Sequence, residues 1–437
     1  MPFALPLALA LLAGRGEATG FRITAHGAKA MGMAGAFAAQ ADDPSTIYYN
    51  PAGITQLGGT QLQGGFTFIV APGPSFTPFP GQATIDGTTG APSVAQNADV
   101  PGRVFPLPTF FATRQLTDRL AVGFGTYSPF GLAVDWPDTW TGRQITTFNE
   151  LRSSYFDFVA AYDVRPWWTL AAGVDLVYST AKLSRTTFVL PSPSTTESLL
   201  QFEGDGFGLA YELAALLRIG SLLKLGVSYR HQAVIEYDGD IDVIPPQGIL
   251  ASEPPSQSAS TKLPLPSTLV IGLAASPTDK WTVEFDWDIT FWESFRSLSL
   301  RIPGSPTLQQ GFESSAPFPN RRWKDSHILR LGTEYQVARR LALRLGAAYI
   351  TTPIPDETLD PVLPDADRTS LTAGLGYVLR QGLSLDLAYE YQHFHDRTKN
   401  NEVPQGPQFS SFPGLRANGL YETDAHVFVA QIKYSFR

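Results

Sequence analysis

Long runs of alternating apolar and polar residues constrain the fold of this chain more than any other feature. In one run the apolar positions are Trp281, Val283, Phe285, Trp287, Ile289 and Phe291, and the polar positions are Thr282, Glu284, Asp286, Asp288 and Thr290. A second run alternates in the same way from Leu383 to Tyr391. Successive side chains of a β-strand point to opposite faces, so each run predicts a strand with one apolar and one polar face.

Strand length and connection length separate the two all-β architectures that alternate in this way, a soluble sandwich and a membrane barrel. Several predicted strands are much longer than the roughly five or six residues usual in soluble sheets. They span residues 167–190, 200–219, 222–241 and 280–302. Short links recur near residues 117–118, 165–166, 220–221, 277–279, 338–339 and 381–382, and longer links lie between them at residues 71–105, 130–151, 191–197, 242–261, 303–324, 352–367 and 399–422.

Counting strands between these links gives about fourteen, an even number with short turns at one end and long loops at the other. Bacterial outer-membrane barrels have this pattern. The sequence therefore predicts an all-β fold, a transmembrane antiparallel β-barrel of about 14 strands over residues 59–437. Trp167, Trp168, Trp281 and Tyr434 fall near the short turns, where an aromatic girdle is expected, although ordinary strand aromatics would give the same pattern.

The composition agrees with a membrane barrel and excludes one class of partner. Only 16% of the residues are charged, whereas ordinary globular domains have about a quarter. The formal net charge is −8, so we expect no nucleic-acid partner. Beyond the N-terminus no apolar run approaches the roughly twenty residues that a membrane helix needs. Membrane crossing would then require strands closed into a barrel, because lipid cannot satisfy an open sheet edge.

The N-terminal residues 1–18 are interpreted as a signal peptide. Residues 2–13 form an apolar run of suitable length, and Gly16-Glu17-Ala18 offers a cleavage site before Thr19. No Lys or Arg precedes the apolar run, so the signal is atypical or the true start lies upstream. A structured N-terminal strand is the alternative.

Residues 19–58 are expected to form a hatch that plugs the barrel lumen with short helices and loops. The segment is rich in Ala and Gly, and small side chains suit a crowded lumen. Asp42-Asp43-Pro44 and Asn50-Pro51-Ala52-Gly53 have turn chemistry, and as isolated motifs they would indicate surface turns. Gly32-Met33-Ala34-Gly35 is not read as a nucleotide loop, because no strand precedes it and no βαβ unit follows.

These motifs together resemble the FadL-type outer-membrane transporters of long-chain fatty acids and other hydrophobic compounds, a family that also contains TodX-type transporters of aromatic hydrocarbons. The N-terminal likeness lies in residues 20–21, 32–37, 41–46 and 50–53. It returns, in the family's order and spacing, in residues 323–327, 353–355, 364–368 and 385–389. The resemblance covers nearly the whole chain and implies a plugged barrel that carries hydrophobic molecules.

The resemblance also implies where ligand binds. Phe21 matches the hatch aromatic that reaches the family's inner pocket. A carboxylate ligand would need a cation there, and the candidates are Lys182, Arg185 and Lys324. Each is equally well explained as a solvated or ion-paired lumen residue.

An interrupted strand carries the expected exit. Ser128-Pro129-Phe130-Gly131 falls within the third strand, where proline cannot donate to a ladder and glycine permits a bend. The resemblance implies that the wall opens sideways here, with the hatch motif Asn50, Pro51 and Ala52 against the opening. The alternative is that the strand simply ends at Ser128. Transport would be passive, with ligand shifting the hatch between conformations.

The expected partners are a long-chain fatty acid or other hydrophobic small molecule, outer-membrane lipid and lipopolysaccharide. The last strand, residues 426–436, looks like the terminal signal read by the barrel-assembly machinery, although the chain ends on Arg437 instead of an aromatic. We expect a monomer in the outer membrane of a Gram-negative bacterium, with no cofactor and no metal. Aromatic hydrocarbons are the alternative cargo.

Functions from other classes stay open at this point. An outer-membrane lipid hydrolase would need a nucleophile with a positioned base, and no Gly-x-Ser-x-Gly motif accompanies the six histidines. His393 and His395 share a strand face and could bind a metal, or lie at a solvated strand end. A non-specific porin or a surface adhesin is a further possibility.

Overall fold

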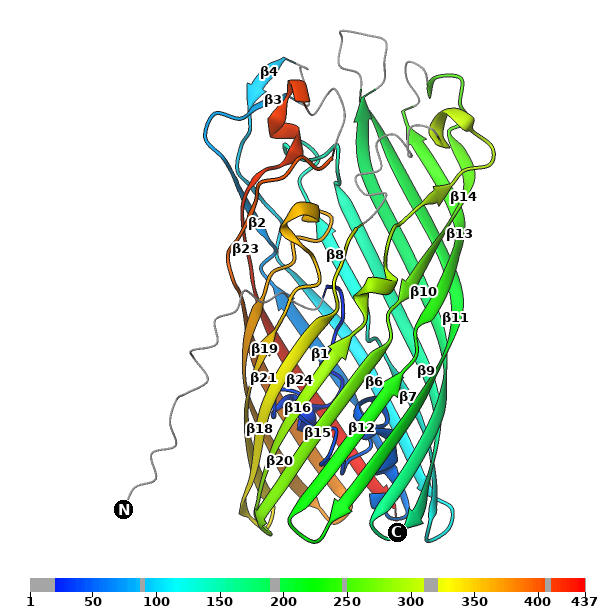
Figure 1. Ribbon diagram of the computed structural model, residues 1–437, viewed down its shortest axis with the longest axis vertical. Coiled ribbons are helices and arrows are strands. Elements are labelled where there is room, and N and C mark those ends of the chain that lie inside the picture. The colour runs from blue at the N-terminus through cyan, green and yellow to red at the C-terminus, as the bar shows by residue number, and fades with distance from the viewer. Residues whose placement is uncertain are drawn as a thin grey trace.

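The computed structural model describes residues 20–86, 91–188, 197–245, 250–309, 321–404 and 410–436. The expected signal peptide, residues 1–18, lies outside the described residues. Figure 1 shows a tall barrel of tilted strands with the N-terminal segment inside it. No helix among the described residues is long and apolar enough to cross a membrane.

The helical elements are few and short. Within the described residues they include α1 (Ala28–Met31), α2 (Thr46–Tyr49), η1 (Pro51–Gln56), η3 (Trp292–Ser294), η4 (Asp356–Thr358) and η5 (Pro413–Arg416).

Strands make up most of the described chain. The wall is built from β1 (Thr60–Ala71), β6 (Arg103–Gln115), β7 (Leu120–Tyr127), β8 (Gly131–Asp135), β9 (Phe148–Arg165), β10 (Trp168–Phe188), β11 (Glu197–Ile219), β12 (Leu223–Arg230), β13 (Ala233–Ile244), β14 (Ser256–Leu265), β15 (Thr268–Thr278), β16 (Trp281–Thr290), β17 (Leu300–Arg301), β18 (Ser326–Ala338), β19 (Leu341–Ile350), β20 (Arg368–Arg380), β21 (Leu383–Phe394) and β24 (Asp424–Phe436). Smaller strands of the outer loops are β2 (Ser75–Pro78), β3 (Ala83–Ile85), β4 (Pro92–Val94), β5 (Ala98–Asp99), β22 (Arg397–Lys399) and β23 (Gly419–Glu422).

The wall is a closed antiparallel barrel of fourteen strands, which confirms the predicted fold class. β1 pairs with both β24 and β6, and this double pairing closes the cylinder. Four positions in the ring are each filled by two consecutive segments, namely β7 with β8, β12 with β13, β14 with β15, and β16 with β17. Closure leaves no free edge along most of the wall, as a membrane requires.

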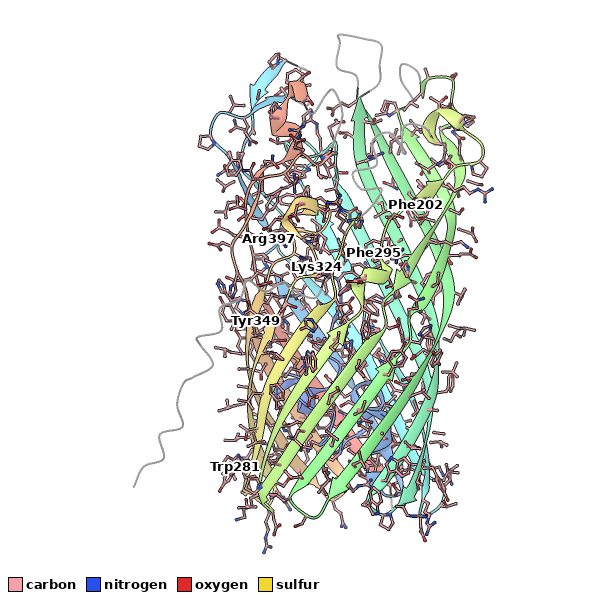
Figure 2. The ribbon with its side chains drawn as sticks, in the orientation of Figure 1. Phe202, Trp281, Phe295, Lys324, Tyr349 and Arg397 are labelled. Atoms are coloured by element: carbon pink, nitrogen blue, oxygen red, sulfur yellow. The ribbon has the colours of Figure 1, made fainter. Side chains whose placement is uncertain are left out.

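The predicted alternation is present, with the apolar side chains outward. Phe285 and Trp287 of β16 are 45% and 41% exposed, while Asp286 between them is only 1% exposed. This is the reverse of a soluble sandwich, whose apolar faces pack inward. An outward apolar band and a polar interior match a barrel wall in lipid. Trp281 lies at the rim that carries the short turns (Figure 2).

The hatch, residues 19–58 and described from residue 20, lies inside the barrel toward the end with the short turns (Figure 1). Its small residues allow close contact with the wall. A Cβ atom placed on Gly226 of β12 would lie 1.9 Å from the carbonyl oxygen of Ala38. Glycine is therefore required at this wall position, and the hatch backbone packs directly against β12.

The opposite end carries the long loops. β2, β5, β22 and β23 form a small sheet there. It packs against Trp136 and Trp140, whose rings stack 4.3 Å apart. These loops cover the barrel above the hatch (Figure 1).

Candidate functional site

A chamber of about 710 Å³ lies above the hatch. Its floor is the start of the hatch, residues 20–25, and its walls come from β1, β6, β8, β9, β21 and β24. The lining is largely apolar, which suits an oily ligand.

Five aromatic rings form an aromatic cluster, and two of them, Phe21 and Phe130, line the chamber. The cluster consists of Phe21, Phe130, Trp292, Phe295 and Trp323. The Phe21 ring lies at its centre, 4.7 Å from the ring of Trp292 in an edge-to-face arrangement, and it is only 7% exposed. Edge-to-face pairs at such distances are favourable beyond the area they bury. Phe21 therefore fills an apolar seat that an apolar ligand group could also fill.

The backbone before Phe21 is held in place by the outer loops. Gly20 donates its N–H to Asp365 at 2.9 Å and has φ of +63°. A Cβ atom at Gly20 would lie 2.9 Å from the Trp292 ring, so glycine is needed on both counts. One hydrogen bond thus joins two motifs that lie 345 residues apart in the chain, at residues 20–21 and 364–368.

The strand interruption lies beside this cluster. β7 ends at Tyr127 and β8 begins at Gly131, so residues 128–130 belong to neither strand. The start of the hatch bonds to this segment: Ile23 N–H donates to the carbonyl of Pro129 at 2.8 Å, and Gly131 N–H donates to the carbonyl of Phe21 at 3.0 Å. Arg22 and Phe130 are consequently opposite each other in an isolated antiparallel bridge. The residues that fill the aromatic cluster also hold the interrupted strand.

Two arginines and one aspartate fix the start of the hatch to the wall. Arg22 donates to Asp288 at 2.6 Å and to Thr290 at 2.9 Å. The same Asp288 accepts from Arg330 at 3.1 Å, and Arg330 donates at 2.7 Å to the carbonyl of Ala34 in the hatch. A buried carboxylate between two guanidinium groups satisfies the pairing that buried charges need.

Two carboxylates of β16 hold four consecutive backbone N–H groups of the hatch. Phe37 and Ala38 donate to one oxygen of Asp286 at 2.9 and 3.0 Å. Ala39 and Gln40 donate to the two oxygens of Glu284 at 2.6 and 2.8 Å. Residues 284, 286 and 288 share the inner face of β16 because they are two apart, so one strand face anchors the hatch.

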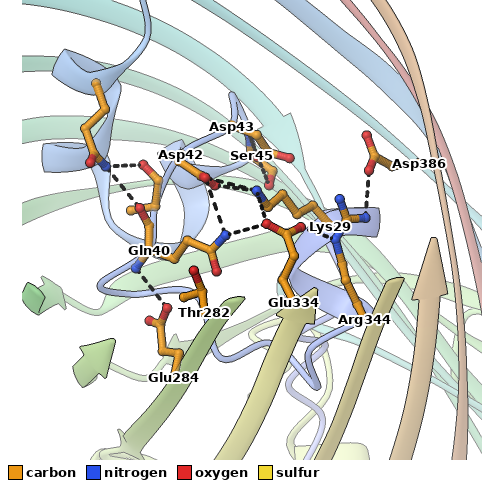
Figure 3. A network of polar contacts seen from close by, with 12 residues as sticks. Lys29, Gln40, Asp42, Asp43, Ser45, Thr282, Glu284, Glu334, Arg344 and Asp386 are labelled. Atoms are coloured by element: carbon orange, nitrogen blue, oxygen red, sulfur yellow. Dashed lines mark hydrogen bonds and ion pairs between the residues drawn. The ribbon is translucent and has the colours of Figure 1, made fainter. Parts of the chain in front are cut away.

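A polar network continues this anchor across the wall (Figure 3). Lys29 of the hatch forms ion pairs with Asp42 at 2.8 Å and with Glu334 at 3.0 Å. Arg344 joins Glu334 to Asp386 at 2.6 and 2.7 Å. Burial alone would lower the pKa of Lys29, but the carboxylates of Asp42 and Glu334 outweigh it and raise that pKa.

His26 is buried completely within the hatch. Its Nε2 lies 2.9 Å from the carbonyl of Ile23, and its ring meets the Tyr48 ring edge-to-face at 4.4 Å. Burial lowers its pKa from the ordinary 6.5 to about 3, and nearby Arg22 and Arg230 act in the same direction. The imidazole is therefore neutral at physiological pH.

The four expected ligand residues do not gather at the chamber. Phe21 lines it, as described above. Lys182 is on the outer face of β10 and pairs with Glu203 at 2.9 Å. Arg185 is on β10 as well and does not line the chamber, and Lys324 is exposed just before β18 (Figure 2). Among the described residues, the cations that line the chamber are Arg22, Arg103, Arg152 and Arg368.

The sequence interpretation missed these four arginines, although two of them carried a sequence signal. Arg368 ends the motif at residues 364–368, and its guanidinium lies 4.6 Å from the centre of the Phe394 ring. Arg22 directly follows Phe21, so alternation could have placed it opposite the aromatic side chain. Arg103 and Arg152 carried no motif and required the tertiary structure.

Asn50 organises the lower hatch. Its side-chain oxygen accepts from Ala52 N–H at 3.0 Å, which caps the helix η1. Its amide nitrogen donates to the carbonyl of Ala38 at 2.6 Å and to that of Ala215 in β11 at 3.1 Å. The hatch residues whose printed backbone bonds reach segment 129–131 are Phe21 and Ile23, at the start of the hatch, and Ser153 of β9 bonds Phe130 from the wall.

The histidine pair of the metal alternative is on the outer part of the wall. His393 Nδ1 lies 2.8 Å from Asp424, and both side chains are largely exposed. The part of the chain that the structure describes contains no group of three or more His, Cys, Asp or Glu side chains suited to hold a metal ion.

Comparison with known proteins gives a family match over nearly the whole chain. The model of the family described as "Outer membrane protein transport protein (OMPP1/FadL/TodX)" matches residues 9–436. A long-chain fatty acid transport protein of Escherichia coli O6:H1 is 24% identical over 425 residues, which are 89% of this chain and 90% of that protein.

Solved structures share the fold. A Pseudomonas aeruginosa FadL homologue superposes with a TM-score of 0.82 at 20% identity and covers 96% of this chain and 100% of its own. The Pseudomonas putida toluene transporter TodX gives a TM-score of 0.67 at 16% identity, with 95% and 99% coverage. At these identities the likeness establishes the barrel with its inner hatch.

Proposed function

Because the chain belongs to the outer membrane protein transport family of FadL and TodX, it is an outer-membrane transporter of hydrophobic compounds, and we propose that its cargo is long-chain fatty acids released sideways through the wall. Members of this family are transporters or channels, so the hydrolase interpretation is set aside. The family transports hydrophobic compounds, so the non-specific porin interpretation is set aside as well.

The proposed binding step is competition for the aromatic cluster. An apolar chain entering the chamber gains most by occupying the most enclosed apolar seat, which Phe21 fills in the free protein. Ligand displaces the Phe21 ring and thereby favours a hatch conformation in which residues 20–23 have moved. Ligand binding shifts a population in this scheme, and no energy source is required.

The observation that carries the proposal is the shared use of residues 21–23. The carbonyl of Phe21 accepts from the N–H of Gly131, the N–H of Ile23 donates to the carbonyl of Pro129, and the Phe21 ring packs on Phe130 at 6.0 Å. Moving residues 21–23 therefore removes the bonds between the hatch and the interrupted strand, and Phe130 keeps its bonds to Ser153 of β9. With the hatch no longer attached, segment 128–131 can shift, and the chamber gains an outlet at the level of the lipid.

One feature favours a fatty acid over an uncharged hydrocarbon. Arg368 lines the chamber, and its guanidinium could pair with a carboxylate, whereas the guanidinium of Arg22 is already paired with Asp288. The second candidate, an aromatic hydrocarbon, is favoured by the ring cluster itself, because flat rings would replace Phe21 well. Similar proteins represent both cargo classes: one relative is named as a long-chain fatty acid transport protein, and one protein with the same fold is a toluene transporter.

A reversible lock tests the proposed route. Arg22 and Phe130 are opposite residues of a non-hydrogen-bonded antiparallel pair, whose Cα spacing of about 4.5 Å suits a disulfide. The chain contains no cysteine, so Arg22→Cys with Phe130→Cys creates a single defined bridge. We expect uptake of radiolabelled oleate by whole cells to be low in the oxidised form and to recover on reduction.

The comparison is made within one variant, so the loss of the two native side chains cancels. Each single cysteine variant serves as a control whose uptake must not respond to reductant. Equal uptake by the locked and reduced forms would rule out gating by residues 21–23. Uptake of radiolabelled toluene, measured beside that of oleate, separates the two cargo classes: a fatty acid carrier takes up oleate, and a hydrocarbon carrier takes up toluene.

A further inference from the structure

One stretch of the wall has a ladder partner on one side only. β6 pairs with β1 along its length, from Thr60↔Arg114 to Ala71↔Arg103. On its other side β6 pairs with β7 only from Phe110↔Thr126 to Gln115↔Ala121. β8 pairs with β9, and within the described residues no ladder joins β8 to residues 103–109 of β6. We call this unpaired region the gap.

Two prolines lie on the gap side of β6. Alternate residues of a strand direct their N–H and C=O groups toward the same neighbour, so Pro106 and Pro108 share one edge. The ladder with β1 continues through Phe68↔Pro106 and Phe66↔Pro108. Proline cannot donate, so the bonds of that ladder come from residues 105, 107 and 109. The missing donors of Pro106 and Pro108 therefore belong to the edge that faces the gap.

The residues that border the gap agree with Pro106 and Pro108 facing it. Phe110 has the same parity as the two prolines and is the residue at which pairing with β7 begins. At the outer end, Arg103 of β6 forms an ion pair with Asp135 of β8, which joins the two edges by side chains alone. Pro106 and Pro108 line the chamber, together with Ser128, Gly131 and Ala133 from the opposite edge. The chamber thus reaches the gap.

We propose that Pro106 and Pro108 are positioning residues that keep the wall from closing at the gap. Unpaired strand edges pair readily with any available strand, and edge prolines are a known means of preventing it. Without N–H donors at these two positions, β6 cannot form a regular ladder with β8 when segment 128–131 moves. Proline at these two positions also avoids two backbone N–H groups that would face lipid without a hydrogen-bond partner. An unpaired backbone N–H group in lipid is costly in free energy.

This inference rests on the proposed sideways release. It assigns β6 as the edge of the outlet that does not move. The hatch and segment 128–131 would form the moving side, and β6 the stationary side. Its test restores the donors with strand-forming residues, in the double variant Pro106→Val with Pro108→Val. The single variants Pro106→Ala and Pro108→Ala each restore one donor and are expected to give intermediate effects.

Two measurements are needed in each variant. Hydrogen exchange in detergent reports whether the new amides at 106 and 108 are protected, and oleate is measured both for binding to purified protein and for uptake by cells. We expect protected amides, unchanged binding, and uptake that falls roughly tenfold, the change that about 1.4 kcal/mol in favour of a closed wall corresponds to. Val104→Ala, on the same edge of β6, is the matched control because it adds no donor.

The outcomes separate this inference from the function it rests on. Amides that exchange freely in the double variant would show that the prolines do not keep the edges apart, and the inference would be overturned with the proposed route intact. Protected amides with normal uptake would mean that cargo does not leave through the gap, which overturns the proposed route as well. Loss of binding together with uptake would indicate general damage to the chamber and would also count against a positioning role.

Discussion

At the scale of single residues, the buried polar groups of this barrel are used to hold the hatch. His26 illustrates how closely the surroundings of such a group suit its charge state. Its imidazole is enclosed by Tyr48 and Tyr127 and has two arginines nearby, so the hatch tolerates this residue only as the neutral base. A proton on His26 would be both desolvated and repelled.

The pH dependence of the hatch follows from this environment. The pKa of His26 is about 3 in the folded hatch and ordinarily 6.5, so the opened hatch binds the proton more readily. The contribution is fully present above pH 6.5 and is lost progressively as the pH falls toward 3. We expect the exchange protection of hatch amides to weaken from pH 6.5 to pH 4, and His26→Gln to reduce that weakening.

The measurement is hydrogen exchange of residues 26–36, corrected for the intrinsic rate at each pH. Glutamine can still donate to the carbonyl of Ile23 but carries no titrating group. His393→Gln is the control, because His393 is exposed on the outer part of the wall. If the hatch of His26→Gln loses protection on acidification as steeply as that of the unsubstituted protein, His26 is excluded as the cause.

At the scale of elements, β16 does more than contribute one strand to the wall. Its outer face is apolar, and its inner face supplies Glu284, Asp286 and Asp288 to the hatch. Glu284 and Asp286 accept hydrogen bonds from the hatch backbone in different ways. Glu284 uses both of its oxygens, one for each N–H, whereas Asp286 accepts both N–H groups with a single oxygen.

This difference predicts unequal effects of the two conservative amide substitutions. In Glu284→Gln one acceptor becomes an NH₂ group that faces an N–H donor, so we expect residues 39–40 to lose about 1–3 kcal/mol of local stability. In Asp286→Asn the side-chain carbonyl can keep the position of the accepting oxygen, so residues 37–38 should change little. Native-state hydrogen exchange of amides 37–40 measures both, and equal losses in the two variants would contradict the assigned geometry.

At the scale of the whole molecule, the wall has an apolar outer band that only a lipid bilayer can cover. Large apolar side chains such as Leu209, Leu213 and Phe207 of β11 are more than half exposed. A soluble protein of this size would not leave such a continuous band in water. The family to which the chain belongs places this band in the outer membrane.

The depth of a residue in the membrane then sets the cost of a charge. Leu213 is near the middle of the lower half of β11, and Ile219 is the last residue of the strand beside a short turn. Both are about equally exposed, at 53% and 54%. We expect Leu213→Lys to lower the free energy of unfolding in liposomes by about 2–4 kcal/mol and Ile219→Lys by at most about 1 kcal/mol. Similar costs at the two sites would argue that β11 does not cross the bilayer at this level.

The sequence alone determined the architecture because the period of two and the alternation of short and long links are local properties. The odd or even position of a residue along a strand could also have shown which face its side chain takes. Lys182 has the parity of Leu170, Val174 and Leu176, which face outward, while Arg185 has the opposite parity, so the two could never share a site on the lumen side.

The site itself was decided by the tertiary structure. The aromatic cluster combines residues from the hatch, the interrupted strand and two loops about 300 residues away, and the unpaired edge of β6 exists only because β8 pairs elsewhere. Alternation states which face a side chain takes, but closing the barrel decides which other faces it meets across the lumen. That closure, together with the position of the hatch inside it, brings Phe21 to Trp292 and Pro129.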